Sequence, residues 1–142
     1  MNSKDDGDHI TDIRSFLKKR DELVRSGSLD QVRVLLDERY GKDTNQRHAA
    51  ECELKWDCGY REEALQDSIY RLKCGEYTVD HILMATRYSL ILNNIHNINY
   101  LYNSFKSNIN ETSSIYFIEY AYRKLNNMEI DDNLKRIGWM MT

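Results

Sequence analysis

The sequence contains no proline and only six glycines among its 142 residues. These glycines stand apart from one another, so the sequence has neither a Gly-rich phosphate-binding loop nor a serine elbow. Apolar and polar residues nowhere alternate over the length of a strand. These absences disfavour a β-sheet fold and the common catalytic loop motifs, and they make helix the expected structure.

A long apolar run is also missing. The most apolar stretch, near residues 82–92, is interrupted by Thr86, Arg87 and Ser89 and is far shorter than a membrane span. The first eight residues are polar and acidic, unlike a secretory signal. We therefore expect a cytoplasmic protein without a membrane partner, with residues 1–8 disordered and a single all-helical domain over residues 9–142.

Charge and composition narrow the function classes. Apolar residues make up 41% and charged residues 30% of the chain, which is typical of folded proteins. The net charge is -3, and Lys18-Lys19-Arg20 is the only compact basic run. Nucleic-acid binders usually concentrate a larger positive patch on one face, so the composition disfavours nucleic acid as a partner.

The cysteines and histidines of the sequence do not have the spacing of a metal site or of a reactive thiol pair. Three cysteines, an odd number in a chain with no secretory signal, indicate reduced thiols. His48 and Cys52 share a helical face, but Cys58 points elsewhere and no Cys-x-x-Cys pair occurs. We expect no metal site, no cofactor and no catalytic residue.

Helical periodicity is what the sequence does contain. Apolar residues recur at three- and four-residue steps, as at Ile10, Ile13, Phe16 and Leu17. Helix-terminating residue types interrupt this periodicity. The pattern predicts eight helices, at residues 9–26, 29–40, 44–58, 61–74, 78–93, 95–107, 111–126 and 131–140.

Paired in order, these helices make four hairpins, with internal breaks at Gly27, Gly59, Asn93 and Asn126. The breaks are spaced by 32, 34 and 33 residues, a period typical of a helical solenoid. The segment at 59–65, Gly-Tyr-Arg-Glu-Glu-Ala-Leu, resembles the turn and second-helix start of a tetratricopeptide repeat. The sequence thus predicts an all-α fold of stacked hairpins, with an irregular helical bundle as the alternative.

The resemblance extends to packing positions on both helices of the hairpins. Matching positions include Phe16, Ile82, Thr86, Val32 and Ala64. Arg20 and Glu119 depart from the family, which has a small residue there, and the closing proline is absent throughout.

Repeats of this family hold a partner segment in a groove lined by the first helices of successive hairpins. The positions that the resemblance assigns to this groove are Arg14, Leu17, Asp21, Ala49, Glu53, Trp56, Asp80, Leu83, Arg87, Leu90, Tyr116 and Tyr120. Tryptophan, tyrosine and arginine dominate interface energies, so partner binding is expected at these positions. Trp56 is either a core residue or the best single anchor.

We therefore expect a non-catalytic adaptor or chaperone-like protein that binds a segment of another protein, and it resembles small bacterial secretion chaperones. An immunity or antitoxin-type inhibitor of a partner enzyme is the alternative. A third interpretation is a nucleic-acid-associated protein that uses Lys18, Lys19, Arg20, Arg25 and Arg33. The Trp139-Met140-Met141 end is either the cap of the last hairpin or an adhesive end for homodimerisation.

Overall fold

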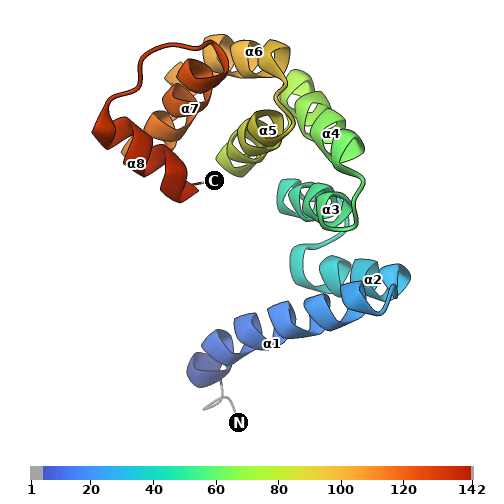
Figure 1. Ribbon diagram of the computed structural model, residues 1–142. Helices are drawn as coiled ribbons and strands as arrows, with labels where there is room; N and C mark the ends of the chain where they lie inside the picture. The colour runs from blue at the N-terminus through green and yellow to red at the C-terminus, as the bar shows by residue number, and fades with distance from the viewer. Residues whose placement is uncertain (1–4, 142) are drawn as a thin grey trace. The chain divides into compact units, whose positions relative to one another are not determined.

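The computed structural model describes the backbone of residues 5–141 and the side chains of residues 12–140. This part of the chain is all-α and contains no strand (Figure 1). Its helices are α1 (Asp5–Arg25), α2 (Leu29–Tyr40), α3 (Asn45–Asp57), α4 (Arg61–Cys74), α5 (Val79–Ile91), α6 (Ile95–Phe105), α7 (Thr112–Leu125) and α8 (Asp132–Met141). A short 3-10 helix, η2 (Lys106–Asn108), follows α6. The predicted all-α fold of eight helices is confirmed.

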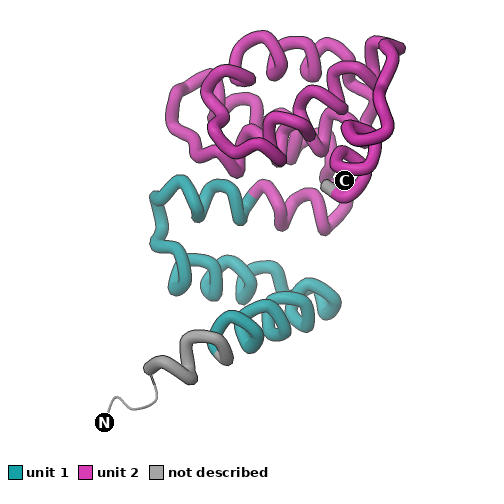
Figure 2. The backbone as a smooth tube through the Cα atoms, turned by 90° about the vertical axis from the view of Figure 1, so that its left-hand side faces the viewer, with its two compact units in different colours: residues 1–51 teal, residues 52–142 magenta. Residues whose placement is uncertain are grey.

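The chain forms two compact units, residues 1–51 (unit 1) and residues 52–142 (unit 2), and the boundary falls inside α3 (Figure 2). The single domain expected over residues 9–142 stays a prediction, and each of the two units is described by itself below. The segment at 1–8, expected to be disordered, lies partly outside the described residues. From Asp5 onward its backbone belongs to α1.

The turns inside all four hairpins share one hydrogen-bonded geometry. Each contains one residue with positive φ: Gly27 (75°), Gly59 (93°), Asn93 (54°) and Asn127 (56°). In each turn the N–H of this residue donates to the carbonyl three residues earlier, and the next N–H donates to the carbonyl five residues earlier. This is the Schellman arrangement, in which a left-handed residue ends a helix. The repeat that the spacing of the breaks predicted is therefore seen in the backbone dihedral angles and hydrogen bonds of the turns.

The left-handed residue of the fourth hairpin is Asn127, one residue after the predicted break at Asn126. Asn126 has φ −93°, an ordinary conformation. Asparagine tolerates the left-handed conformation better than most residues, so two adjacent asparagines leave the choice open in the sequence. Because repeat positions on α7 are counted from the left-handed residue, each residue of α7 takes a repeat position that differs by one from the predicted position.

Burial repeats in step with the left-handed residues. The residues seven positions before them are all buried: Arg20, Cys52, Thr86 and Tyr120. The residues five positions after the first three of them are buried as well: Val32, Ala64 and Ile98. The fourth hairpin leaves this pattern after its turn, because α8 begins only at Asp132, which is exposed.

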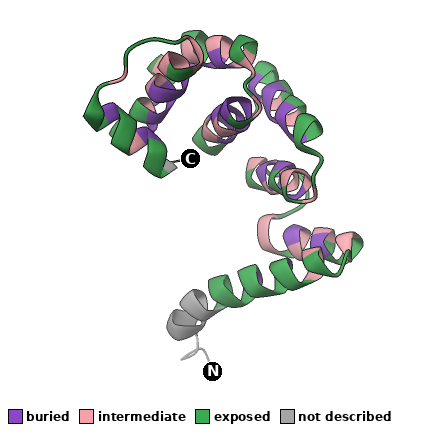
Figure 3. Cartoon of the chain, in the orientation of Figure 1, coloured by how far each residue is buried: buried purple, intermediate pink, exposed green. Residues whose placement is uncertain are grey.

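Unit 2 has its core where α5, α6, α7 and α8 meet. The buried residues of this cluster are Leu90, Ile98, Phe117, Tyr120, Ala121 and Leu134. The buried parts of α4, α5 and α7 are seen in Figure 3. The buried hydroxyls of Ser68 and Thr86 are satisfied locally, since Ser68 Oγ donates to the carbonyl of Leu65 at 2.8 Å and Thr86 Oγ1 to that of Ile82 at 2.7 Å.

In unit 1, α1 packs against α2 around the buried side chains of Phe16, Val32 and Leu36. The rings of Phe16 and Tyr40 meet edge to face, with centroids 5.9 Å apart.

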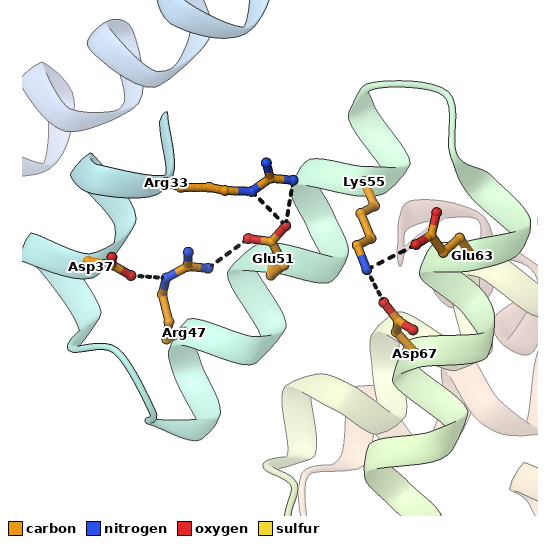
Figure 4. A network of polar contacts seen from close by, with 7 residues as sticks. All are labelled: Arg33, Asp37, Arg47, Glu51, Lys55, Glu63 and Asp67. Atoms are coloured by element: carbon orange, nitrogen blue, oxygen red, sulfur yellow. Dashed lines mark hydrogen bonds and ion pairs between the residues drawn. The ribbon is translucent and has the colours of Figure 1, made fainter. Parts of the chain in front are cut away.

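A charged network joins α2 to the first part of α3 (Figure 4). Nε of the buried Arg47 donates to Asp37 at 2.7 Å, and Nη1 of Arg47 donates to Glu51 at 3.0 Å. Arg33 Nε also donates to Glu51, at 3.1 Å. Two arginines and two carboxylates thus balance one another, which offsets the cost of burying the Arg47 guanidinium.

Candidate partner-binding site

The residues predicted to line a groove fall in both units. Arg14, Leu17 and Asp21 are exposed on α1 in unit 1, whereas Ala49 is buried in the same unit. The remaining predicted residues belong to unit 2, and the candidate site is confined to that unit.

Trp56 is the centre of this site. Its indole ring, in the last turn of α3, stacks on the ring of Tyr88 in α5, with centroids 4.0 Å apart and planes 4° from parallel. The guanidinium carbon of Arg61, the first residue of α4, lies 4.7 Å from the centroid of the same indole. Trp56 is half-buried, so it is neither a pure core residue nor a fully exposed one. Aromatic stacking and a cation–π contact hold it in place.

Charged residues of both signs surround the stack. Glu53 and Asp57 lie one turn apart on α3 and are exposed, and the half-buried Arg87 precedes Tyr88 on α5. Burial raises the pKa of the Tyr88 hydroxyl, the negative charges of Glu53 and Asp57 raise it further, and Arg87 opposes them. The phenol therefore stays neutral in ordinary buffers. The Trp56 surface is the set Trp56, Tyr88, Arg61, Glu53, Asp57 and Arg87.

Lys55 ties α3 to α4 beside Trp56 (Figure 4). Its Nζ lies 2.5 Å from Oδ2 of Asp67 and 3.3 Å from Oε1 of Glu63. The hydrogen bond to Asp67 raises the pKa of Lys55, and the attraction of both carboxylates outweighs the effect of its partial burial. This contact fixes the turn of α3 that carries the indole.

Not all predicted residues of α5 belong to the Trp56 surface. Leu83 is half-buried and packs against the core of unit 2, and Leu90 is part of that core. Asp80 is exposed in the first turn of α5. The structure thus brings Glu53, Trp56 and Arg87 together around Tyr88, and it gives Leu83 and Leu90 packing roles.

Tyr120 is a core residue and not a groove residue, because it is only 4% exposed. Its assignment to the groove followed from the predicted break at Asn126. With Asn127 as the left-handed residue, Tyr120 occupies the buried position that Cys52 and Thr86 hold in the preceding hairpins. The sequence signal that would have found this is a register counted from Asn127.

Tyr116 is 42% exposed and lines a depression of about 690 Å³ along α7 and α8, which the sequence did not predict. Charged residues of both signs line it: Lys106, Arg123, Arg136, Glu119, Glu129 and Asp131. Some of them are already bonded, since Glu119 accepts from Lys106 at 2.6 Å and from Arg123 at 3.1 Å. Most of its lining comes from α7 and α8, so the depression depends on how these two helices pack, which the periodicity of each helix does not predict.

Metal-ligating residues do not cluster in the described part of the chain, where no three His, Cys, Asp or Glu side chains are placed to hold a metal ion. All three cysteines lie in this part and form no disulfide: Cys52 is buried, Cys58 half-buried and Cys74 exposed. Over the same residues, no helix is long and apolar enough to cross a bilayer.

No protein-family model, curated protein or solved structure matches the chain significantly. The hairpins with a common turn geometry are compatible with a helical-hairpin repeat protein. The likeness to tetratricopeptide repeats stays a resemblance.

Proposed function

We propose that the chain is a non-catalytic protein-binding module, an adaptor or chaperone-like protein, that holds a segment of another protein on the Trp56 surface of unit 2. The observation that carries the proposal is the Trp56–Tyr88 stack, with Arg61 over the indole and charges of both signs around it. Tryptophan, tyrosine and arginine are the residue types that contribute most to interface energies.

The contacts of Trp56 suit an anchor that is ordered before a partner arrives. Tyr88 is buried, and Lys55 fixes the turn of α3 next to the indole. A side chain that is already ordered avoids a loss of about 0.5–1.5 kcal/mol of conformational entropy on binding.

The chemistry of the surface indicates the kind of segment it would bind. Trp56 offers apolar area, Glu53 and Asp57 attract basic groups, and Arg61 and Arg87 attract acidic groups. The expected partner is therefore a segment with an apolar residue flanked by charges of both signs. In the repeats that this chain resembles, the helices that correspond to α3 and α5 line the groove.

Binding of nucleic acid is a weaker proposal, because the cations suggested for it do not form one basic patch. Arg20 is buried, and Arg33 is hydrogen-bonded to Glu51. Lys18, Lys19 and Arg25 are exposed, which is fewer cations than a nucleic-acid surface usually presents.

Selection of a random peptide library on phage against the full chain tests the proposed function. Enriched peptides are then titrated by tryptophan fluorescence in a Trp139→Phe background, so that only Trp56 emits. We expect an apolar residue flanked by charges, and a loss of affinity of about tenfold or more for Arg87→Glu and for Glu53→Lys, which corresponds to about 1.4 kcal/mol.

Lys42→Glu, at an exposed residue of unit 1, is the control for an unspecific effect of charge and should bind the peptides as the parent does. All variants are first checked for unchanged helix content and melting. Peptides that bind both Trp56-surface variants as tightly as the parent would contradict the proposed surface, and a selection that enriches no peptide would contradict segment binding.

A further inference from the structure

The last helix has two faces of different character. Leu134 and Gly138, one turn apart, are buried in the face of α8 that packs on α7. Four exposed residues share the other face: Asp132, Lys135, Arg136 and Trp139. Lys135 and Arg136 lie three and four positions after Asp132 and four and three positions before Trp139, and Arg136 stands at the edge of this face, next to the depression described above. We refer to these four residues as the α8 stripe.

The end of this stripe is strongly apolar. Trp139 is 72% exposed and the adjacent Met140 is 76% exposed, more than any other large hydrophobic side chain in the described residues. Met128, in the segment that leads into α8, is 44% exposed. Adjacent exposed apolar side chains such as Trp139 and Met140 mark interaction sites.

The order of charges in the stripe identifies a second copy as the partner that fits. Asp132 lies in the first turn of α8, and Lys135 and Arg136 follow one turn later. A helix with acidic residues first and basic residues next is complementary to itself when it is reversed. In an antiparallel pair centred on residue 134, Asp132 of each copy lies opposite Arg136 of the other, and the same ion pair forms twice.

The apolar end fits the same arrangement. Trp139 lies one turn beyond Arg136 and therefore extends past the first turn of the partner helix, towards the segment that carries Met128. The contact then has apolar groups at both ends and oppositely charged pairs between them, a combination typical of specific interfaces.

We propose that the chain self-associates as a two-fold dimer through antiparallel α8 stripes. This inference is independent of the Trp56 surface, which lies on other helices. Because α8 has only 10 residues, the interface belongs to the small class, and we expect a dimer with a dissociation constant of roughly 10–100 µM.

Sedimentation equilibrium of the full chain between about 1 and 500 µM, a range chosen to span such dissociation constants, tests the proposal. We expect a concentration-dependent monomer–dimer equilibrium. Trp139→Ala should raise the dissociation constant of the dimer at least tenfold, whereas Tyr70→Ala, which removes a similarly exposed aromatic ring from α4 (65% against 72%), should leave it unchanged.

A charge exchange tests the antiparallel register. Asp132→Lys sets a lysine opposite Arg136 of the second copy, and Arg136→Glu sets a glutamate opposite Asp132, so each variant alone should be monomeric. In a mixture of the two variants both ion pairs are restored, and a heterodimer should form with an affinity near that of the wild-type dimer. Circular dichroism of each variant must first show unchanged helix content.

Three outcomes would overturn the proposal. The first is a wild-type chain that remains monomeric over the whole concentration range, and the second is a Trp139→Ala variant that dimerises as the wild type does. The third is a mixture of the two charge variants that stays monomeric. If the first outcome is found, sedimentation of the monomeric chain with vesicles of phosphatidylcholine and phosphatidylserine would assign the α8 stripe to a membrane surface.

Discussion

Gly138 of α8 lies so close to the ring of Tyr120 in α7 that no side chain fits between them. A Cβ at position 138 would come within 3.0 Å of Cγ, Cδ1 and Cδ2 of Tyr120, closer than Cβ atoms approach other atoms in proteins. Glycine inside a helix costs about 1 kcal/mol relative to alanine. The close approach of α7 and α8 gives this glycine a structural role, because it lets Leu134 reach the core of unit 2.

Gly138→Ala should therefore lower the free energy of unfolding by about 1–3 kcal/mol, although alanine is the better helix former. Urea denaturation measures this change. Tyr120→Leu in the Gly138→Ala background should recover part of the loss, and a double-mutant cycle gives the coupling. A Gly138→Ala variant that is more stable than the wild type would mean that α8 does not pack on Tyr120.

Ala64 is completely buried in the first turn of α4, where the hairpin register places a small residue. Ala64→Glu should lower the free energy of unfolding by about 3 kcal/mol or more, because it buries a carboxylate without a counterion. Gln66→Glu, at an exposed position two residues later, is the matched control and should change stability by less than about 0.5 kcal/mol. Equal melting temperatures of the two variants would disprove the register.

Periodicity was sufficient to predict the helices, and isolated glycines and pairs of asparagines located the turns to within one residue. The burial of Ala64 also followed from sequence. What sequence could not resolve was which of two adjacent asparagines takes positive φ, a difference of one backbone conformation. This one-residue choice decided whether Tyr120 is a core or a groove residue.

Long-range contacts were the second limit. The sequence identified Trp56 as an aromatic residue on a charged helix, but the stack on Tyr88 joins residues that are 32 positions apart. The ion pair of Lys55 with Asp67 likewise depends on how α3 packs against α4. Periodicity reports which face of a helix is apolar, and it does not report which residues of another helix lie opposite.

The turn of the fourth hairpin gives a direct test of its left-handed residue. Asn127→Gly should leave stability unchanged or raise it by up to about 1 kcal/mol, because glycine adopts positive φ without strain. Asn126→Gly should lower stability instead, since Asn126 has negative φ and its side chain donates to Asn99 Oδ1 at 2.7 Å and to the Tyr122 carbonyl at 2.8 Å. Thermal unfolding of both variants measures the effect. If Asn127→Gly were the less stable variant, Asn126 would be the residue with the left-handed conformation.

The charged network of unit 1 makes stability depend on pH through Glu51. Burial alone would raise the pKa of this carboxyl, but hydrogen bonds from Arg33 and Arg47 and their positive charges outweigh it and lower the pKa below the usual 4.5. The folded chain therefore binds fewer protons at this site than the unfolded chain at mildly acidic pH. The stabilisation by Glu51 is fully present above the unfolded pKa and is lost as the pH falls through the folded pKa.

Glu51→Gln should lower the free energy of unfolding at pH 7 by about 1–3 kcal/mol, because the buried Arg47 loses one of its two carboxylate partners. The difference from the wild type should shrink as the pH falls from about 5 to 3, since a protonated Glu51 resembles the glutamine. Urea denaturation at four pH values, followed by circular dichroism, measures both effects. Glu38→Gln, at an exposed carboxylate on α2, is the control and should follow the wild type at every pH. A difference between Glu51→Gln and the wild type that is as large at pH 3 as at pH 7 would show that the carboxylate charge does not stabilise unit 1.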